Sequence, residues 1–228
     1  FRASRRRARA ELAAAGLATA SPWALRAAQA QTKMTIGVIY VVGIAVVTWC
    51  VGRLENASWE WLLVVPVFVL SNLFEWWIHK NVMHRLVDVW ALRAIYDRHT
   101  RQHHQYFTDN EMTAGSTRER RIIFFPWRAL FTFMALGMPF ALALAWLVNP
   151  NAGYVLMITI VGQYLIYETF HYCCHVHDNW FVRNVPFVNT IRRHHTVHHS
   201  QGIMMDIDMN LTFPIADWLF GTSDLDRG

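Results

Sequence analysis

The stretch WEWLLVVPVFVLSNLFEWWIHKNVMH, residues 59–84, decides the fold because an apolar run leads directly into a pair of histidines. The apolar run Trp59–Trp77 has the ~20 residues that one helix needs to cross a bilayer. Its only charges are Glu60 and Glu75, near its two ends. The stretch therefore predicts a transmembrane helix that delivers two histidines, His79 and His84, to one face of a membrane.

Three other apolar runs have similar lengths, namely Met34–Gly52, Ala129–Val148 and Gly153–Phe170. The chain has 228 residues, of which 54% are hydrophobic and only 16% are charged. A soluble domain usually carries about a quarter charged residues, and three cysteines are too few for a disulfide scaffold. We therefore expect an all-α integral membrane protein, a four-helix transmembrane bundle with a cytoplasmic helical cap carrying a histidine-rich dimetal site.

The basic residues lie almost entirely outside the apolar runs and predict the orientation. Of 21 Lys and Arg, four spans would leave only Arg53 on the side opposite the termini and the middle loop. Cytoplasmic loops carry such an excess of positive charge. We expect both termini to be cytoplasmic, in the bacterial cytoplasmic membrane. The charge serves topology and membrane lipids, so we expect no nucleic-acid partner.

Residues 1–33 form a basic N-terminal arm, and residues 34–228 the membrane domain. The arm is rich in Ala and Arg and nearly lacks acidic residues. An export signal or organelle transit peptide has a similar composition. We favour an arm on anionic headgroups, because the stretch Leu12–Ala20 is only weakly apolar.

All twelve histidines lie in four short clusters. Histidines placed for packing or for pH sensing have no reason to gather in this way. The clusters are His79 and His84; His99, His103 and His104; His171, His175 and His177; and His194, His195, His198 and His199.

The spacing within the clusters indicates metal ligands. Histidines four residues apart share a helix face and can share a metal, as expected for His99 with His103 and for two later pairs. His79 and His84 are five apart and diverge unless the helix ends or bulges between them. Adjacent histidines diverge by about 100° and suit two different metals.

Four spans would bring all four clusters to one side of the membrane. About ten imidazoles exceed the six ligands of one metal, so two metals are implied. Nearly pure nitrogen ligation with no zinc-finger cysteine pair suggests two irons that handle oxygen. Cys173 and Cys174 are interpreted as packing residues. Five carboxylates near the clusters are candidates to orient the imidazole N–H groups: Glu75, Glu168, Asp178, Asp206 and Asp208. The alternative for each is an ordinary solvated or helix-capping acid.

At this point the sequence resembles the fatty acid hydroxylase/sterol desaturase superfamily of membrane enzymes. The four histidine boxes carry the resemblance, with Glu75-Trp76-Trp77-Ile78-His79 entering the first and Gln102–Phe107 around the second. The tail from Asn210 to Thr222 agrees as well. The resemblance covers about residues 60–222 and leaves the arm unexplained.

The resemblance implies a set of ten metal ligands and leaves His177 and His194 as extras. His194 and His195 have equally permitted spacings, so that choice stays open, and the choice between His175 and His177 stays open as well. The second box has three residues between its first histidines where many relatives have two, which makes His99 the least typical. The implied ligands are His79, His84, His99, His103, His104, His171, His175, His195, His198 and His199.

The resemblance further implies an O2-dependent di-iron oxidase that hydroxylates or desaturates an unactivated C–H bond of a lipid, such as a fatty acyl chain or sterol. Zinc is expected to replace iron readily in isolated protein. Some relatives carry a fused cytochrome b5 domain, for which this chain has no room. We therefore expect a separate electron donor, a ferredoxin or a cytochrome b5 with its reductase.

Two other functions fit the same residues. A carotenoid-ring hydroxylase has a similar box pattern, although its first two boxes are usually closer together. A non-catalytic membrane subunit would keep the metal for structure alone. Iron content with substrate-stimulated O2 uptake distinguishes the enzyme from the subunit.

Overall fold

The computed structural model describes residues 22–117 and 119–224. This part of the chain is helical, and its only strand-like pairing is an isolated bridge between Thr108 and Glu111. The all-α fold class is confirmed. Residues 1–21 of the expected arm lie outside the described residues, so the arm stays a prediction.

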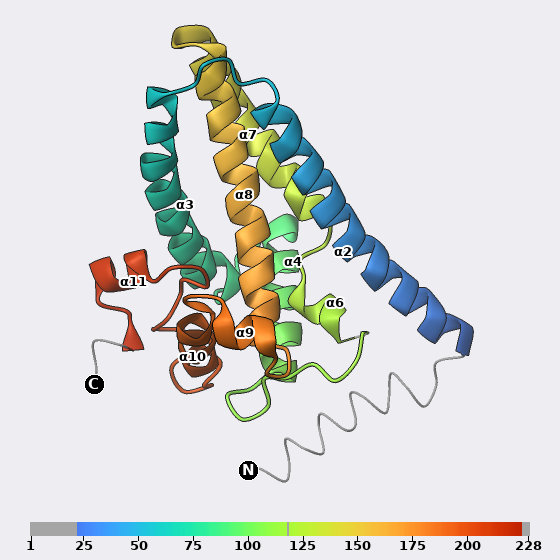
Figure 1. Ribbon diagram of the computed structural model, residues 1–228. Helices are drawn as coiled ribbons and strands as arrows, with labels where there is room; N and C mark the ends of the chain where they lie inside the picture. Colours follow the sequence, from blue (N-terminus) through green and yellow to red (C-terminus); the bar gives the residue numbers. More distant parts are fainter. Residues whose placement is uncertain (1–21, 118, 225–228) are drawn as a thin grey trace.

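Four long helical stretches pack side by side (Figure 1). They are α2 (Pro22–Val51), the run η1 (Trp59–Leu63) with α3 (Val64–Ile78), α7 (Arg128–Leu147) and α8 (Pro150–Cys174). The α8 helix lies among the other three and contacts each of them.

Three helical stretches of the described residues are long and apolar enough to cross a membrane: Arg26–Val51, Trp59–Met83 and Arg120–Leu147. At most 17% of their apolar windows is buried inside the protein, so most of these side chains face outward. Outward-facing apolar helices of this length are consistent with a membrane protein.

The expected fourth span, Gly153–Phe170, lies within α8, which is not among the three. The position of α8 explains its lower hydropathy, because its neighbours cover much of its surface. It therefore carries polar groups that bond within the protein, such as Tyr164, whose hydroxyl donates to Glu168 Oε1 at 2.7 Å. Hydropathy thus supports three spans, and the fourth remains a proposal.

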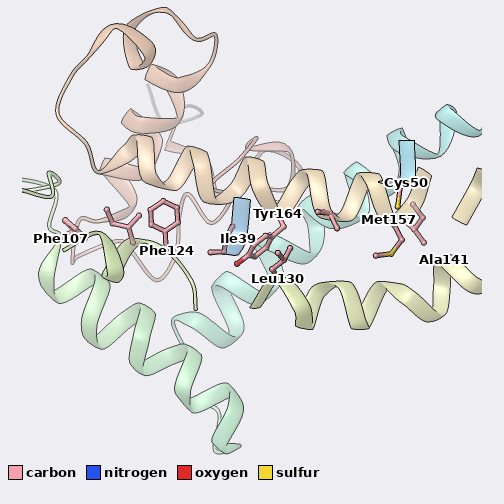
Figure 2. Packing of buried hydrophobic residues seen from close by; sticks show 11 residues of the cluster. Ile39, Cys50, Phe107, Phe124, Leu130, Ala141, Met157 and Tyr164 are labelled. Atoms are coloured by element: carbon pink, nitrogen blue, oxygen red, sulfur yellow. The ribbon is translucent and has the colours of Figure 1, made fainter. Parts of the chain in front are cut away.

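The core lies where α8 meets α2 and α7 (Figure 2). Ile39 of α2, Leu130 of α7 and Val161 of α8 are each at most 1% exposed. Gly153 permits the close approach of α7, because a Cβ there would lie 2.6 Å from the Ala141 carbonyl oxygen. At this end Asn149 caps α8, its side chain accepting from Ala152 N at 3.0 Å.

Short helices gather at the opposite end of the long helices and form what we call the cap (Figure 1). The cap comprises η2 (His79–Met83), α4 (Trp90–Tyr96), η3 (Asp97–His103), α5 (His104–Tyr106), α6 (Arg120–Ile123), α9 (Trp180–Asn184), α10 (Val188–His198) and α11 (Ile215–Phe220). The α3 helix continues directly into η2, and α8 ends beside the cap. The histidines at the ends of both helices therefore lie in this region.

Candidate metal centre

The ten histidines expected as ligands come together inside the cap. They are supplied by η2 and the residue after it, η3, α5, the end of α8, and α10. Each of the ten is at most 4% exposed. Imidazoles are rarely so deeply buried in such number, because each ring brings two polar nitrogens that need partners.

Five of these imidazoles form the first cluster. The Nε2 atom of His99 lies 2.8 Å from that of His79, 3.1 Å from that of His104 and 3.3 Å from that of His84. The Nε2 atoms of His84 and His198 are 3.0 Å apart. The first cluster is therefore His79, His84, His99, His104 and His198.

The other five imidazoles form the second cluster. The Nε2 atom of His103 lies 3.1 Å from those of His171 and His199. The Nε2 atom of His195 lies 3.1 Å from that of His175 and 3.0 Å from that of His199. Four of them, His103, His171, His175 and His195, have ligand atoms close enough together to hold one ion. His199 joins the second cluster through its contacts with His103 and His195.

The two clusters are neighbours. The ring of His104, in the first, stacks on the ring of His199, in the second, with centroids 4.1 Å apart. Adjacent residues of one helix reach both clusters, since His103 and His104 belong to different clusters, as do His198 and His199. Two bound metals would therefore occupy adjacent sites.

Two π-helical turns build the first cluster. In a π-helix the backbone bonds join residues five apart, and His84 N donates to His79 O at 3.1 Å. The same geometry joins His104 N to His99 O. Histidines five residues apart therefore face the same side.

The π-turn corrects one expectation from the sequence. His99 and His103, four residues apart, do not share a cluster. A π-turn takes more residues than an α-turn, so His99 aligns with His104, and His103 points into the second cluster.

Backbone carbonyls orient the imidazoles. An Nδ1–H that donates to a carbonyl leaves the Nε2 lone pair free, so this contact fixes the tautomer. Five Nδ1 atoms make such a contact: His79 with Met209 O, His103 with Ile122 O, His175 with Met112 O, His198 with Ile207 O, and His199 with Phe107 O. None of the five carboxylates considered from the sequence is hydrogen-bonded to these imidazoles among the described residues.

The Nε2 atoms fit metal ions. Where both partners bear their proton on Nδ1, as His103 and His199 do, two Nε2 lone pairs face each other and no hydrogen bond joins them. Two nitrogens bound at right angles to one metal, each at about 2.1 Å, lie about 3.0 Å apart. The observed separations are close to this value, so a cation in each cluster would satisfy the lone pairs.

Burial keeps these imidazoles neutral. Desolvation, reinforced by neighbouring imidazoles, lowers the pKa of His84 to about 2. Desolvation also lowers the pKa of His199 to about 3, against the opposing effect of its bond to Phe107 O. The pKa values of His99, His103 and His104 are likewise lowered well below the ordinary value. Neutral imidazole is the form that binds metals.

The histidines of the two choices that the sequence left open lie in different surroundings. His175 and His195 are in the second cluster, whereas His177 is exposed just after α8 ends. His194 is 2% exposed but faces carboxylates instead of imidazoles. Burial lowers the pKa of His194, but hydrogen bonds to Asp208 and Asp217 outweigh it and raise that pKa to about 10.

Asp217 is a buried residue that the sequence reasoning did not single out. It is 0% exposed and accepts hydrogen bonds from Met209 N, Asn210 N and Thr222 Oγ1. The sequence offered one indication of its importance, because Asp217 lies in the tail from Asn210 to Thr222 that matches the family. The cysteines carry no such role: Cys173 packs with Val182 and Val188, as the packing interpretation expects.

A small, partly open pocket touches both clusters. Its inner wall is formed by His99 of the first cluster and by His103 and His171 of the second. Its other side is formed by Arg98 and by apolar residues of α6 and of the segment after it, namely Ile122, Ile123 and Phe125. The guanidinium of Arg98 donates to the carbonyls of Arg121 and Phe124, which ties this segment to η3.

Comparison with known proteins agrees with this site. The family model described as fatty acid hydroxylase matches residues 64–222, which include all ten clustered histidines. The chain therefore belongs to the fatty acid hydroxylase family. Neither a curated protein nor a solved structure matched the chain.

Proposed function

We propose that this member of the fatty acid hydroxylase family is a membrane-bound, O2-dependent di-iron oxidase that hydroxylates or desaturates an unactivated C–H bond of a lipid. The observation that carries the proposal is the pair of adjacent five-imidazole clusters, buried and neutral. Imidazole ligands suit iron, and the family supports iron over a structural zinc.

The residues of this chain would hold the irons, orient the imidazole ligands and shield the site from water. The first cluster would hold one iron and the second cluster the other, and the bound pair would supply the reduction of O2 and the oxidation of a C–H bond. The carbonyls of Met209, Ile122 and Phe107 keep Nε2 directed inward by accepting from Nδ1. Burial of every ring excludes bulk water, which would otherwise intercept a reactive oxidant.

The wall of the small pocket between η3 and α6 has the apolar character that a lipid substrate needs. Ile122, Ile123 and Phe125 offer an apolar wall, and the histidines opposite come from both clusters. A methylene held in this pocket would lie against both metal sites. Fatty acyl chains and sterols share the apolar character that this wall requires.

The reaction consumes electrons that imidazoles do not supply. We propose that a separate protein, a ferredoxin or a cytochrome b5 with its reductase, delivers them. Membrane lipids surround the long helices.

We further propose that the protein crosses the bacterial cytoplasmic membrane four times. Both termini and the cap would then lie on the cytoplasmic side. The placement of nearly all Lys and Arg on this side supports it. Cysteine-accessibility labelling at engineered positions in residues 1–21 and after Thr222 tests it. Labelling of either end from outside the cell would contradict it.

Product analysis tests the activity. Membranes containing the iron-loaded protein, an electron donor and labelled O2 should yield oxidised lipid, and lipids of cells with and without the gene should differ in that product. Hydroxylation would place one labelled oxygen atom in the lipid and the other in water; desaturation would place both in water. Tightly bound zinc with no O2 uptake under these conditions would instead indicate a non-catalytic metal-binding subunit.

A further inference from the structure

The segment 207–211, which we call the strap, lies across the first cluster. Ile207 O accepts a hydrogen bond from His198 Nδ1 at 3.0 Å, and Met209 O accepts one from His79 Nδ1. Every residue of the strap is at most 2% exposed. The strap therefore orients two of the five imidazoles of the first cluster.

Asp217 holds the strap from the other side. Its Oδ1 accepts from Met209 N at 3.0 Å, and its Oδ2 accepts from Asn210 N at 2.7 Å. Thr222 Oγ1 donates to Asp217 Oδ1 at 2.6 Å. The position of the Met209 carbonyl, and with it the direction of His79, therefore depends on this carboxylate.

Asp208 holds the strap at its centre in a strained conformation. Its φ is +58°, a left-handed value that costs free energy for a residue other than glycine. Its backbone N–H donates to Thr222 O at 2.8 Å, and its Oδ1 accepts from Asp224 N at 2.8 Å. The surroundings must maintain this conformation, because the residue alone would avoid it.

His194 lies among three carboxylates. Its Nδ1 is 3.0 Å from Asp208 Oδ1 and 3.3 Å from Asp224 Oδ1, and its Nε2 is 3.3 Å from Asp217 Oδ2. Because each nitrogen faces a carboxylate oxygen, both donate and the ring is an imidazolium. Two carboxylates at most 1% exposed are costly to bury without such a cation between them.

We propose that His194 is a positioning residue for the first metal site: its ring joins Asp208 to Asp217, and these hold the strap whose carbonyls direct His198 and His79. The inference rests on the proposed di-iron function. The second cluster should be insensitive to His194, because its carbonyl partners come from Met112, Ile122 and Phe107, which lie outside the strap.

The test compares His194→Gln with the unchanged full-length protein, both iron-loaded in lipid nanodiscs. Gln keeps hydrogen-bonding groups but removes the charge. Elemental analysis should show iron falling from two ions per chain to about one, and Mössbauer spectra should show that the remaining site matches that of the second cluster. Turnover should fall by roughly 10- to 100-fold, as for other residues that orient metal ligands. The matched control His177→Ala, at an exposed histidine, should keep both irons and the unchanged spectrum.

Charge rescue distinguishes positioning from general structural damage. Adding Asp208→Asn to His194→Gln removes one unpaired carboxylate, so the double variant should regain part of the lost iron. If His194→Gln does not fold, Thr222→Val weakens the same path by removing one bond to Asp217 and should lower iron in the first site alone.

Two irons, an unchanged spectrum and turnover within about twofold in His194→Gln would overturn the inference while leaving the di-iron proposal intact. A third metal that is lost in this variant would also overturn it, because His194 would then be a ligand. An unchanged protein that takes up no iron pair would overturn the proposed function as well.

Discussion

The two histidine clusters are alike in content but differ in how the backbone builds them. The first takes two pairs of histidines from π-helical turns, His79 with His84 and His99 with His104. The second takes two pairs spaced four residues apart, one from the end of α8 and one from α10 and its C-cap. The spacing rule of the α-helix therefore describes the second cluster and fails for the first.

The clusters also differ in what surrounds them. The strap, which includes Asp208, lies against the first cluster, and the buried residues His194 and Asp217 hold it there. Carbonyls from three separate segments of the cap orient the second. The first site thus depends on one continuous network, and the second on contacts that are independent of one another.

The largest effects should come from removing one ligand of each cluster. His198→Ala should empty the first site, and His175→Ala or His103→Ala should empty the second. Each change should abolish product formation, because two metals acting together are required and the loss opens the coordination of one. Elemental analysis with Mössbauer spectra of each variant would show which site is lost. An active, fully metallated His175→Ala protein would contradict the division into clusters.

The helical fold and the gathering of the histidines could be predicted from the sequence, but their division into two clusters could not. Apolar length and histidine spacing predicted the all-helical fold and the residues that meet. The five-residue spacing of His79 and His84 indicated a helix irregularity, but its π form depends on tertiary packing. The π-turn that pairs His99 with His104 was not predicted, because the sequence favoured His99 with His103. Carbonyl partners such as Met112 O could not be predicted, because every residue has a carbonyl. The lower hydropathy of α8 follows from its central position, which local sequence does not reveal.

Blocking the pocket should separate catalysis from metal binding at both clusters. Ile122→Trp adds bulk to the pocket wall facing His99 and His103, so it should lower kcat/KM by roughly tenfold or more. The Ile122 carbonyl that orients His103 is retained, so both metals should stay bound. Turnover measured beside metal content checks this, with the exposed Leu136→Trp as control. Unchanged turnover would place the substrate elsewhere.

Acidification should destabilise the fold of the metal-free protein, because buried histidines of both clusters resist protonation. The pKa of His84, in the first, is lowered to about 2, and that of His199, in the second, to about 3, against an ordinary value of 6.5. Below pH 6.5 the unfolded chain therefore binds protons that the folded chain does not, and the free energy of unfolding falls as pH decreases. The thermal midpoint in detergent should drop between about pH 7 and about pH 5. The thermal midpoint of the metal-loaded protein should fall less over the first part of this pH range. Equal midpoints with and without metal at every pH would contradict metal binding by these rings.

The smallest effect should follow His177→Ala. His177 is exposed and belongs to neither cluster, so turnover should stay within about twofold of that of the unchanged protein. Steady-state assays check this. Loss of metal in this variant would mean that the third histidine box pairs His171 with His177.

Elemental analysis of the purified full-length protein, loaded with iron without oxygen, tests the central claim most directly. Two adjacent clusters of five imidazoles predict two transition-metal ions per chain, with zinc able to replace iron during overexpression. One ion per chain, or none, on carefully loaded and folded protein would contradict the account.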